Sequence, residues 1–357
     1  MHAVWILTRP GFEVEAGQEY LDQASQLGVF GYFKPYPSLG LVSFVATGDG
    51  SEREILVDRL PMSQLVFARD AYFMLTEIQD LSAQDRVGDL LEAMAALEPQ
   101  VPWGSLEVHV PEGSQDGDLS KFARKWTAPA AKALREKGWL SARRNPEAAR
   151  LELLLLDFQH LLIAESLPGH RAVYAGGRPH LRLPSRAPSR STLKLEEAFQ
   201  VLLNPEERET LLLPGMKAVD LGAAPGGWTY QLVQRDMFVT AIDNGPMDEA
   251  LMESGQVEHL RADGYAWMPD KPVDWMVCDI VDKPRRTIEM VSRWLVERRC
   301  RCTVFNLKLP MKQRLAEWYL CLERLSELLA QCDGKYEVRA KQLYHDREEI
   351  TVMVLPA

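Results

Sequence analysis

A glycine-rich turn between a predicted strand and a predicted helix is the part of this sequence best suited to chemistry. The turn consists of Gly222, Ala223, Ala224, Pro225, Gly226, Gly227 and Trp228. Glycines permit a tight strand-to-helix turn and let the backbone come close to a ligand that side chains would block. Such a turn is typical of a site for a nucleotide-type cofactor.

The turn lacks the signatures of loops that bind phosphates. Neither GxGxxG nor GxxxxGK[ST] occurs, and Pro225 removes an N–H donor that a pyrophosphate would use. A cofactor without phosphates therefore suits the turn better. S-adenosylmethionine fits, because a carboxylate can hold its ribose while backbone groups and further carboxylates hold its sulfonium and amino acid.

Strands and helices alternate regularly from residue 189 onward. The expected strands are 217–221, 238–242, 257–261, 273–278 and 303–307, with helices between them. A last pair, 336–343 and 350–355, is expected to form a hairpin at the edge. The pattern predicts an α/β fold with a Rossmann-like, doubly wound, mostly parallel seven-stranded sheet.

Charged residues stand where these strands end, which is the edge at which such sheets bind ligands. Asp243, Asp263 and Asp279 follow the second, third and fourth strands, and Lys308 follows the fifth. Asp243 lies about twenty residues beyond the glycine turn, where a carboxylate can accept hydrogen bonds from ribose hydroxyls. One acid after a strand is usually a helix cap. Several around one glycine turn indicate a site.

Four short motifs accompany the glycine turn. They are Ser189-Arg190-Ser191-Thr192-Leu193-Lys194-Leu195, Cys278-Asp279-Ile280, Asn306-Leu307-Lys308 and Arg347-Glu348-Glu349-Ile350-Thr351-Val352. As an ordered set, spread over residues 189–355, they resemble the FtsJ-like family of RNA 2′-O-ribose methyltransferases. The resemblance implies a sheet of the S-adenosylmethionine-dependent methyltransferase type, with S-adenosylmethionine as the cofactor.

The resemblance also implies roles for individual residues. Lys194, Asp279, Lys308 and Glu349 match the family's catalytic Lys-Asp-Lys-Glu tetrad. Glu348 is adjacent and would point to the opposite face of a strand, so the sequence leaves open which glutamate is the fourth member. No metal ligand is expected. The expected cofactor-binding residues are Ser191, Gly222, Ala224, Pro225, Gly226, Gly227, Trp228, Asp243, Asp263 and Asp279.

The chemistry of such a reaction explains why lysines and carboxylates occur together. A ribose 2′-OH is a poor nucleophile, so it must be hydrogen-bonded or deprotonated while aimed in line at the methyl group of a sulfonium. A lysine serves as a base only in its neutral form, which desolvation and neighbouring positive charge favour. Carboxylates orient the lysines but favour their charged form. The sequence leaves open which influence prevails.

The N-terminal half is expected to form smaller α+β units. Residues 1–60 resemble a ferredoxin-like unit and residues 61–166 a THUMP-like RNA-binding domain, followed by a linker over 167–188 and the methyltransferase domain over 189–357. The expected strands are 2–7, 29–33, 41–46, 65–68, 71–75, 106–110, 150–157 and 160–165, and the expected helices are 13–27, 83–97 and 119–137.

Two basic windows indicate contact with RNA. Residues 121–144 hold eight basic side chains against a single acid, Glu136, and also contain Trp126 and Trp139. Residues 166–195 hold no acid. Cations can follow a phosphate backbone while tryptophans stack on unpaired bases. The alternative is a solvated helix face and an ordinary basic linker, but two such windows beside one cofactor module favour RNA.

With these N-terminal units, the whole chain resembles large-subunit rRNA methyltransferases. This implies methyl transfer to the ribose 2′-OH of a cytidine in 23S ribosomal RNA, before the subunit is fully assembled. A net charge of −10 argues against a protein that coats nucleic acid indiscriminately. The N-terminus lacks a basic signal-peptide region, and the longest apolar run, 151–164, is broken by charges. We therefore expect a cytoplasmic protein without membrane contact.

Other functions compete with this interpretation. A base-directed N-methyltransferase would show a DPPY-like tetrad where Asp279-Ile280-Val281-Asp282 stands. A cytosine C5 enzyme needs a thiol nucleophile, usually after a proline, and no Pro-Cys pair occurs. An NAD-dependent oxidoreductase lacks its glycine fingerprint. A non-catalytic RNA-binding or ribosome-assembly factor that keeps the cofactor fold is a further alternative, against which the set of Lys194, Asp279 and Lys308 argues.

Overall fold

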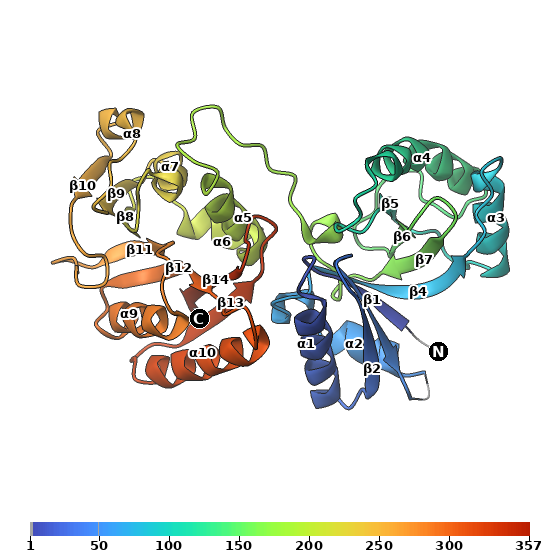
Figure 1. The fold of residues 1–357 in the computed structure, drawn as a ribbon, viewed down its shortest axis with the longest axis horizontal. Coiled ribbons are helices and arrows are strands. Elements are labelled where there is room, and N and C mark those ends of the chain that lie inside the picture. Colours follow the sequence, from blue (N-terminus) through green and yellow to red (C-terminus); the bar gives the residue numbers. More distant parts are fainter. Residues whose placement is uncertain (1–2, 49) are drawn as a thin grey trace. The chain divides into compact units, whose positions relative to one another are not determined.

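Two compact units, Met1–Arg178 and Pro179–Ala357, make up the chain in a computed structural model that describes residues 3–48 and 50–357 (Figure 1). Within those residues, each unit is built on a seven-stranded sheet with helices packed against it. No helix in the described part of the chain has both the length and the apolar character needed to cross a membrane.

The first unit has one continuous sheet. Its strand order is β2-β3-β1-β4-β7-β6-β5, and β4 pairs antiparallel with β1 on one side and β7 on the other. The ferredoxin-like strands and those of the following segment therefore share a sheet. The elements are β1 (Ala3–Leu7), α1 (Glu13–Gln26), β2 (Gly31–Tyr36), β3 (Leu41–Ala46), α2 (Glu52–Arg59), the 3-10 turn η1 (Met62–Gln64), β4 (Asp70–Ile78), α3 (Arg86–Ala96), β5 (Ser105–His109), α4 (Gly117–Glu136), β6 (Arg150–Leu155), β7 (Leu161–Ser166) and the 3-10 turn η2 (Ala175–Gly177).

Two hydrophobic cores hold the helices of the first unit on its sheet. Tyr20 of α1 and Leu56 of α2 pack with residues of β1, β3 and β4. Leu90 of α3 and Leu134 of α4 pack with residues of β6 and β7. The apolar side chains recur at helical spacing, so one face of each helix is withdrawn from water.

One expected strand of the first unit is wrong. Residues 65–68 are buried but irregular, because the buried carboxylate of Glu19 accepts hydrogen bonds from Val66 N at 2.7 Å and Phe67 N at 2.8 Å. A side chain thus satisfies the backbone groups that a strand would pair. Helix α2 has no counterpart among the expected elements. The other expected elements are present within a few residues, and His2 lies outside the described residues.

The second unit confirms the predicted fold class. Its strand order is β10-β9-β8-β11-β12-β14-β13, with β8 to β12 parallel and β14 antiparallel to both β12 and β13. The elements are α5 (Thr192–Leu202), α6 (Pro205–Leu211), β8 (Lys217–Leu221), α7 (Gly227–Val233), β9 (Phe238–Ile242), α8 (Glu249–Glu253), β10 (Val257–Leu260), β11 (Val273–Cys278), α9 (Pro284–Val296), β12 (Cys300–Lys308), α10 (Arg314–Leu329), β13 (Tyr336–Lys341) and β14 (Glu349–Pro356).

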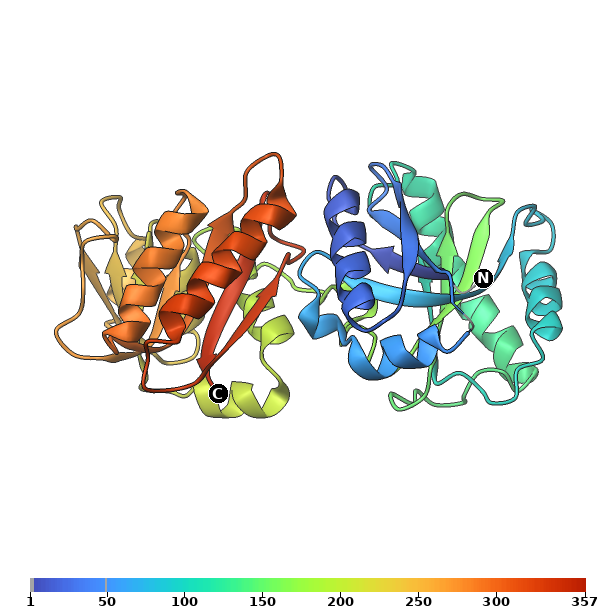
Figure 2. The same ribbon diagram turned by 90° about the horizontal axis from the view of Figure 1, so that it is seen from below.

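Helices cover both faces of the second sheet. The orange and red helices α9 and α10 lie side by side on one face, while α5 and α7 pack on the other (Figures 1 and 2). The strand order reverses between β8 and β11, which are hydrogen-bonded neighbours. In doubly wound sheets the ligand site lies at the carboxyl ends of the strands at such a reversal.

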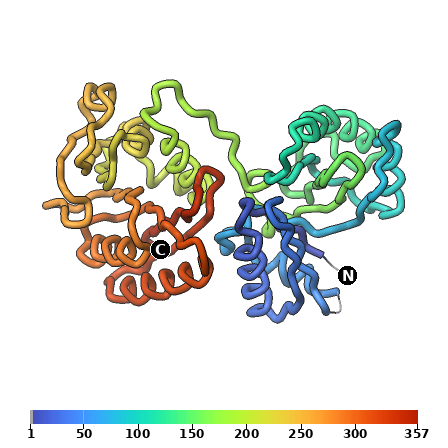
Figure 3. The backbone as a smooth tube through the Cα atoms, in the orientation of Figure 1, coloured from blue at the N-terminus to red at the C-terminus, as the bar shows by residue number. Residues whose placement is uncertain are grey.

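Residues 167–178 are bound to the first unit. The carboxylate of Asp70 accepts hydrogen bonds from Ala172 N at 2.9 Å and Gly176 N at 3.0 Å. Arg178 forms an ion pair of 3.7 Å with Glu112. From residue 179 to residue 191 the chain forms neither helix nor strand (Figure 3).

Candidate active site

The glycine turn joins β8 to α7 at the point where the strand order reverses. Gly222 and Gly226 have φ values of 77° and 118°, in the left-handed region that suits glycine. A Cβ on Gly222 would lie 2.7 Å from Ile280 Cγ1, and a Cβ on Gly226 would lie 2.3 Å from Leu251 Cδ1. Both the backbone conformation and the space left by Ile280 and Leu251 therefore require glycine at these two positions.

The start of α5 packs directly against this turn. A Cβ on Gly227 would lie 2.0 Å from Ser191 Oγ and 2.4 Å from Ser189 Oγ. The two serine hydroxyls are hydrogen-bonded at 2.6 Å. The side chain of Trp228, by contrast, is withdrawn from the surface: the residue is 2% exposed and belongs to the hydrophobic core. Trp228 can therefore offer a ligand only its backbone.

The carboxylates that follow β9 and β10 accept hydrogen bonds from backbone N–H groups of nearby loops. Asp243 accepts hydrogen bonds from Ala224 N at 3.0 Å and Gly245 N at 2.7 Å, so it braces the glycine turn. Asp263 is exposed, and its carboxylate accepts a hydrogen bond from Tyr265 N at 2.9 Å. Each ionised carboxylate has about four acceptor positions, so both keep capacity for a ligand.

Ile280 brings the loop after β11 against the other two loops. It lies where a Cβ on Gly222 would be, and its Cδ1 lies 2.9 Å from the position of a Cβ on Gly264. Gly264 follows Asp263 directly. The glycine turn, the Asp263 loop and the loop after Asp279 thus meet at one edge, as the sequence predicts.

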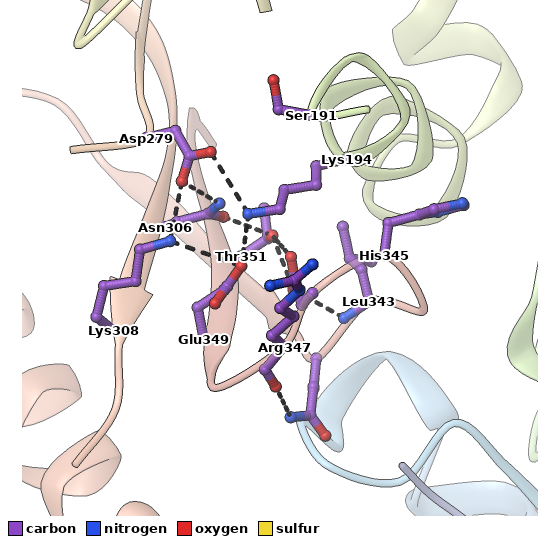
Figure 4. Close-up of polar contacts among 12 residues, drawn as sticks. Ser191, Lys194, Asp279, Asn306, Lys308, Leu343, His345, Arg347, Glu349 and Thr351 are labelled. Atoms are coloured by element: carbon purple, nitrogen blue, oxygen red, sulfur yellow. Dashed lines mark hydrogen bonds and ion pairs between the residues drawn. The ribbon is translucent and has the colours of Figure 1, made fainter. Parts of the chain in front are cut away.

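Four charged side chains from four elements point toward one another at this edge (Figure 4). Lys194 Nζ, on α5, lies 2.5 Å from Glu349 Oε1 and 3.4 Å from Asp279 Oδ2. Lys308 Nζ, at the end of β12, lies 3.1 Å from Asp279 Oδ1 and 3.5 Å from Glu349 Oε1. The expected tetrad residues therefore form one compact cluster of two cations and two anions.

Backbone pairing places two of these side chains together. Lys308 and Glu349 are direct partners in the antiparallel ladder of β12 and β14. Glu349 is buried, whereas Glu348 points away from the cluster and its Oε2 accepts a hydrogen bond of 2.7 Å from Arg314 Nη2. The geometry thus selects Glu349 over Glu348 as the fourth member of the cluster.

The electrostatic surroundings keep Lys194 charged. Burial acts to lower the pKa of Lys194, but the nearby carboxylates of Asp279 and Glu349 outweigh it, and the pKa is raised. The question that the sequence leaves open is therefore answered for this lysine: opposite charge prevails over desolvation. Lys194 is a fixed cation in the cluster.

A buried hydrogen-bond chain behind the cluster orients Asp279. Asn306 Nδ2 donates to Asp279 Oδ1 at 2.8 Å, and Thr351 Oγ1 donates to Asn306 Oδ1 at 2.8 Å. Asp346 lies beyond, with its Oδ2 at 3.0 Å from Thr351 Oγ1. Burial, and next the charge of Glu349, raise the pKa of Asp346 well above its usual range.

The raised pKa of Asp346 indicates which groups donate and which accept along this series of hydrogen bonds. The Thr351 hydroxyl carries one proton and gives it to Asn306 Oδ1, and the raised pKa of Asp346 favours the protonated carboxyl, which can donate to Thr351 in turn. The Asn306 amide is then held with its N–H₂ toward Asp279. None of Asn306, Thr351 and Asp346 was among the expected site residues, because their role depends on contacts between distant segments.

Known proteins match this chain along its whole length. Residues 1–72 match the RlmM ferredoxin-like domain, residues 85–167 the N-terminal domain of ribosomal RNA large subunit methyltransferase M, and residues 187–308 the FtsJ-like methyltransferase family. The chain is 50% identical, over 356 residues and 99% of both chains, to ribosomal RNA large subunit methyltransferase M of Marinobacter nauticus. This chain belongs to the RlmM family.

A second relative supports the same membership. The protein of that name from Tolumonas auensis is 45% identical over 355 residues, which cover 99% of this chain and 96% of the relative. The predicted FtsJ-like and ferredoxin-like units are confirmed. The FtsJ-like match ends at Lys308 and so does not include Glu349. In this RlmM family member, the pairing of β12 with β14 brings Glu349 to the cluster.

The structure offers neither a thiol nucleophile nor a metal cluster at this site. Cys278 precedes Asp279 but is fully buried, and burial raises its pKa to about 12. A buried neutral thiol is a poor nucleophile. Among residues 3–48 and 50–357, no group of three or more His, Cys, Asp or Glu side chains could hold a metal ion.

The first basic window of this RlmM family member, residues 121–144, begins on α4 and continues beyond its end at Glu136, and the role predicted for Trp126 is wrong. Trp126 is 5% exposed and packs in the core of α3 and α4, and Trp139 is partly buried against it. The prediction that Trp126 stacks on bases is therefore wrong. Apolar residues at helical spacing, Leu119, Ala123, Trp126 and Ala130, were the signal. The cations Arg124, Lys125 and Lys132 are exposed.

The second basic window divides into structural and exposed residues. His170 is fully buried, hydrogen-bonded to Tyr20 and Leu60, and burial lowers its pKa to about 4. Arg171 donates to the carbonyls of Ala148 and Pro146. These side chains hold the first unit together and are not free for RNA. The exposed cations of the window are Arg182, Arg186 and Arg190.

Proposed function

We propose that this protein transfers a methyl group from S-adenosylmethionine to the ribose 2′-OH of a cytidine in 23S ribosomal RNA, in the cytoplasm and before the subunit is fully assembled. Membership of the RlmM family supports the substrate class. The observation that carries ribose chemistry is the cluster in which Lys194 and Lys308 share Asp279 and Glu349. The choice of cytidine follows the family resemblance.

The site fits S-adenosylmethionine. Gly222 and Gly226 permit the tight turn after β8, and Asp243, Asp263 and Asp279 place carboxylates in the turn and in the loops at the same edge of the sheet. Carboxylates suit the ribose hydroxyls and the amino group of this cofactor. Ser191 and the backbone from Ala224 to Trp228 complete the proposed cofactor-binding set.

The methyl donor supplies an electrophilic methyl group on a positively charged sulfur. The chain's own residues act on the ribose. Lys194 is held as a cation, so we assign the role of base to Lys308, whose neutral Nζ would accept the proton of the 2′-OH while the methyl group passes from the sulfur to the ribose oxygen and leaves a neutral thioether. Asp279 and Glu349 hold the Nζ atoms of both lysines in place, and Asn306 fixes Asp279.

Analysis of the methylated nucleoside tests this proposal. Purified protein, labelled S-adenosylmethionine and unmodified 23S rRNA transcript are incubated, and the RNA is digested to nucleosides. We expect the label in 2′-O-methylcytidine. Label in 5-methylcytidine or in an N-methylated base would contradict the proposal. Cofactor binding without any transfer to naked or partly assembled rRNA would favour a ribosome-assembly factor.

A further inference from the structure

Two loops beside the charged cluster each hold an apolar side chain in solvent. Val281 stands two residues beyond Asp279 and is 79% exposed, and Met311 stands three residues beyond Lys308 and is 86% exposed. β11 and β12 are parallel neighbours, so both loops leave the same edge of the sheet. Single exposed apolar residues are common. Here two of them lie in the loops that directly follow Asp279 and Lys308, at the same edge of the sheet as the charged cluster.

The loop that carries Met311 is anchored on both sides. Leu309 is buried and its N–H donates to Glu348 O at 2.9 Å. Arg314 donates to the carboxylate of the same glutamate at 2.7 Å. The exposure of Met311 is therefore built into a braced loop.

The other loop is braced as well. Asp282 accepts a hydrogen bond from Arg286 at 2.6 Å. Arg285 pairs with Glu317 at 3.2 Å, which ties the first turn of α9 to that of α10. Val281 and Met311 thus belong to one fixed rim around Asp279 and Lys308.

The rim is basic in a chain that is acidic overall. Residues 280–286 and 309–314 contain a single acid, Asp282, although the net charge of the whole chain is −10. Lys283 and Lys312 are exposed next to the two apolar side chains. The basic residues of the rim are Lys283, Arg285, Arg286, Lys312 and Arg314. Apolar contacts flanked by cations match a nucleotide, which has an apolar base face and charged phosphates.

We infer that Val281 and Met311 contact the unstacked base of the target nucleotide, while Lys283 and Lys312 bind the phosphates beside it. The inference rests on the proposed function, because it assigns the residues that aim the ribose at Lys308. The ribose lies between its base and its phosphates, so contacts to both fix the 2′-OH. Apolar contact is possible with any base, and contacts to phosphates carry no information about the base. The rim therefore positions the target nucleotide and does not select the RNA sequence.

Alanine variants of the apolar pair test the base contact. Val281→Ala with Met311→Ala should lower kcat/KM for 23S rRNA transcript about tenfold and leave the Kd for S-adenosylmethionine unchanged. Met252→Ala is the matched control, since this methionine is 39% exposed on α8 of the same unit. Both variants should keep the wild-type melting temperature, because exposed side chains contribute little to the core.

The lysines are tested by the salt dependence of RNA binding. Lys283→Ala with Lys312→Ala should reduce the slope of log affinity against log salt by about 1.4, at about 0.7 per phosphate contact to single-stranded RNA. Lys271→Ala is the control, because Lys271 is exposed just before β11, at the opposite edge of the sheet.

The outcomes separate this inference from the proposed function. If the wild-type protein methylates ribose, and kcat/KM and the salt slope are both unchanged in the two double variants, the inference is overturned but the proposed function stands. A loss of activity on ribosomal particles but not on naked transcript would also overturn it, because the rim would then contact protein. Wild-type protein that methylates no ribose would overturn both.

Discussion

Lys194 and Lys308 share both of their carboxylate partners, although one stands on a helix and the other at the end of a strand. Each lies within 3.5 Å of both Asp279 and Glu349. Removing either carboxylate therefore disturbs both lysines at once. The cluster acts as one unit, and the effects of single substitutions within it should not add.

Glu349 and Glu348 provide a matched pair of substitutions. Glu349→Gln should lower the rate of methyl transfer at least tenfold, because it removes a charge that holds both lysines and that helps to raise the pKa of Lys194. Glu348→Gln should keep the wild-type rate, since this side chain faces away from the lysines and a glutamine oxygen can still accept the hydrogen bond from Arg314 that braces the Met311 loop. Single-turnover rates with saturating cofactor measure both. Equal losses would mean that the fourth member of the tetrad is misassigned.

Asp346 should tolerate an amide but not a methyl group. Asp346 Oδ2 lies 3.0 Å from Thr351 Oγ1 and accepts a hydrogen bond from Leu343 N at 2.9 Å, and an asparagine amide can make a hydrogen bond to each of these groups. Asp346→Asn should therefore keep activity and stability. Asp346→Ala leaves buried polar groups unpaired and should cost about 1–3 kcal/mol of unfolding free energy. Urea unfolding and methyl-transfer rates test the pair, and a severe defect in Asp346→Asn would show that Asp346 acts as an anion.

Asp243 should matter for the cofactor and not for the RNA. Asp243→Ala removes two hydrogen bonds that brace the glycine turn and any hydrogen bond to the cofactor ribose. We expect affinity for S-adenosylmethionine to fall about tenfold or more, as for loss of charge-assisted hydrogen bonds worth about 1.5–3 kcal/mol. Calorimetry measures this directly. Unchanged affinity would show that Asp243 acts only within its own loop.

The exposed cations of α4 should contribute to RNA binding through charge. Replacing Arg124, Lys125 and Lys132 by alanine should flatten the slope of log affinity against log salt by about two to three units. The control replaces three exposed cations near the amino ends of strands in the second unit, Lys271, Arg301 and Lys335. If the α4 variant keeps the wild-type slope, the helix is a solvated face and the RNA binds elsewhere.

The strands of the second unit could be predicted because buried parallel strands form short apolar runs bounded by turns. Asp279 and Lys308 could be placed as well, since the ends of parallel strands meet at one edge. Their supporting residues could not be predicted. Asp346 and Thr351 come together with Asn306 only through the pairing of β12 with β14.

The errors in the first unit have the same origin. Residues 65–68 have strand-like composition, and only the distant Glu19 makes them irregular. Trp126 was predictable as a core residue from helical spacing, but the surrounding cations favoured a role in RNA binding. Local pattern predicts the elements, whereas contacts between distant segments decide what each side chain does.

The most direct test of the central claim is to map ribose methylation on 23S rRNA in cells that lack this gene and carry either the wild-type protein or Lys308→Met. Methionine keeps the length and apolar stem of lysine and removes the amine. The account predicts one 2′-O-methylated cytidine that depends on the wild-type protein and is absent with Lys308→Met, while the purified variant binds S-adenosylmethionine with wild-type affinity. Full methylation of that cytidine by Lys308→Met would contradict it.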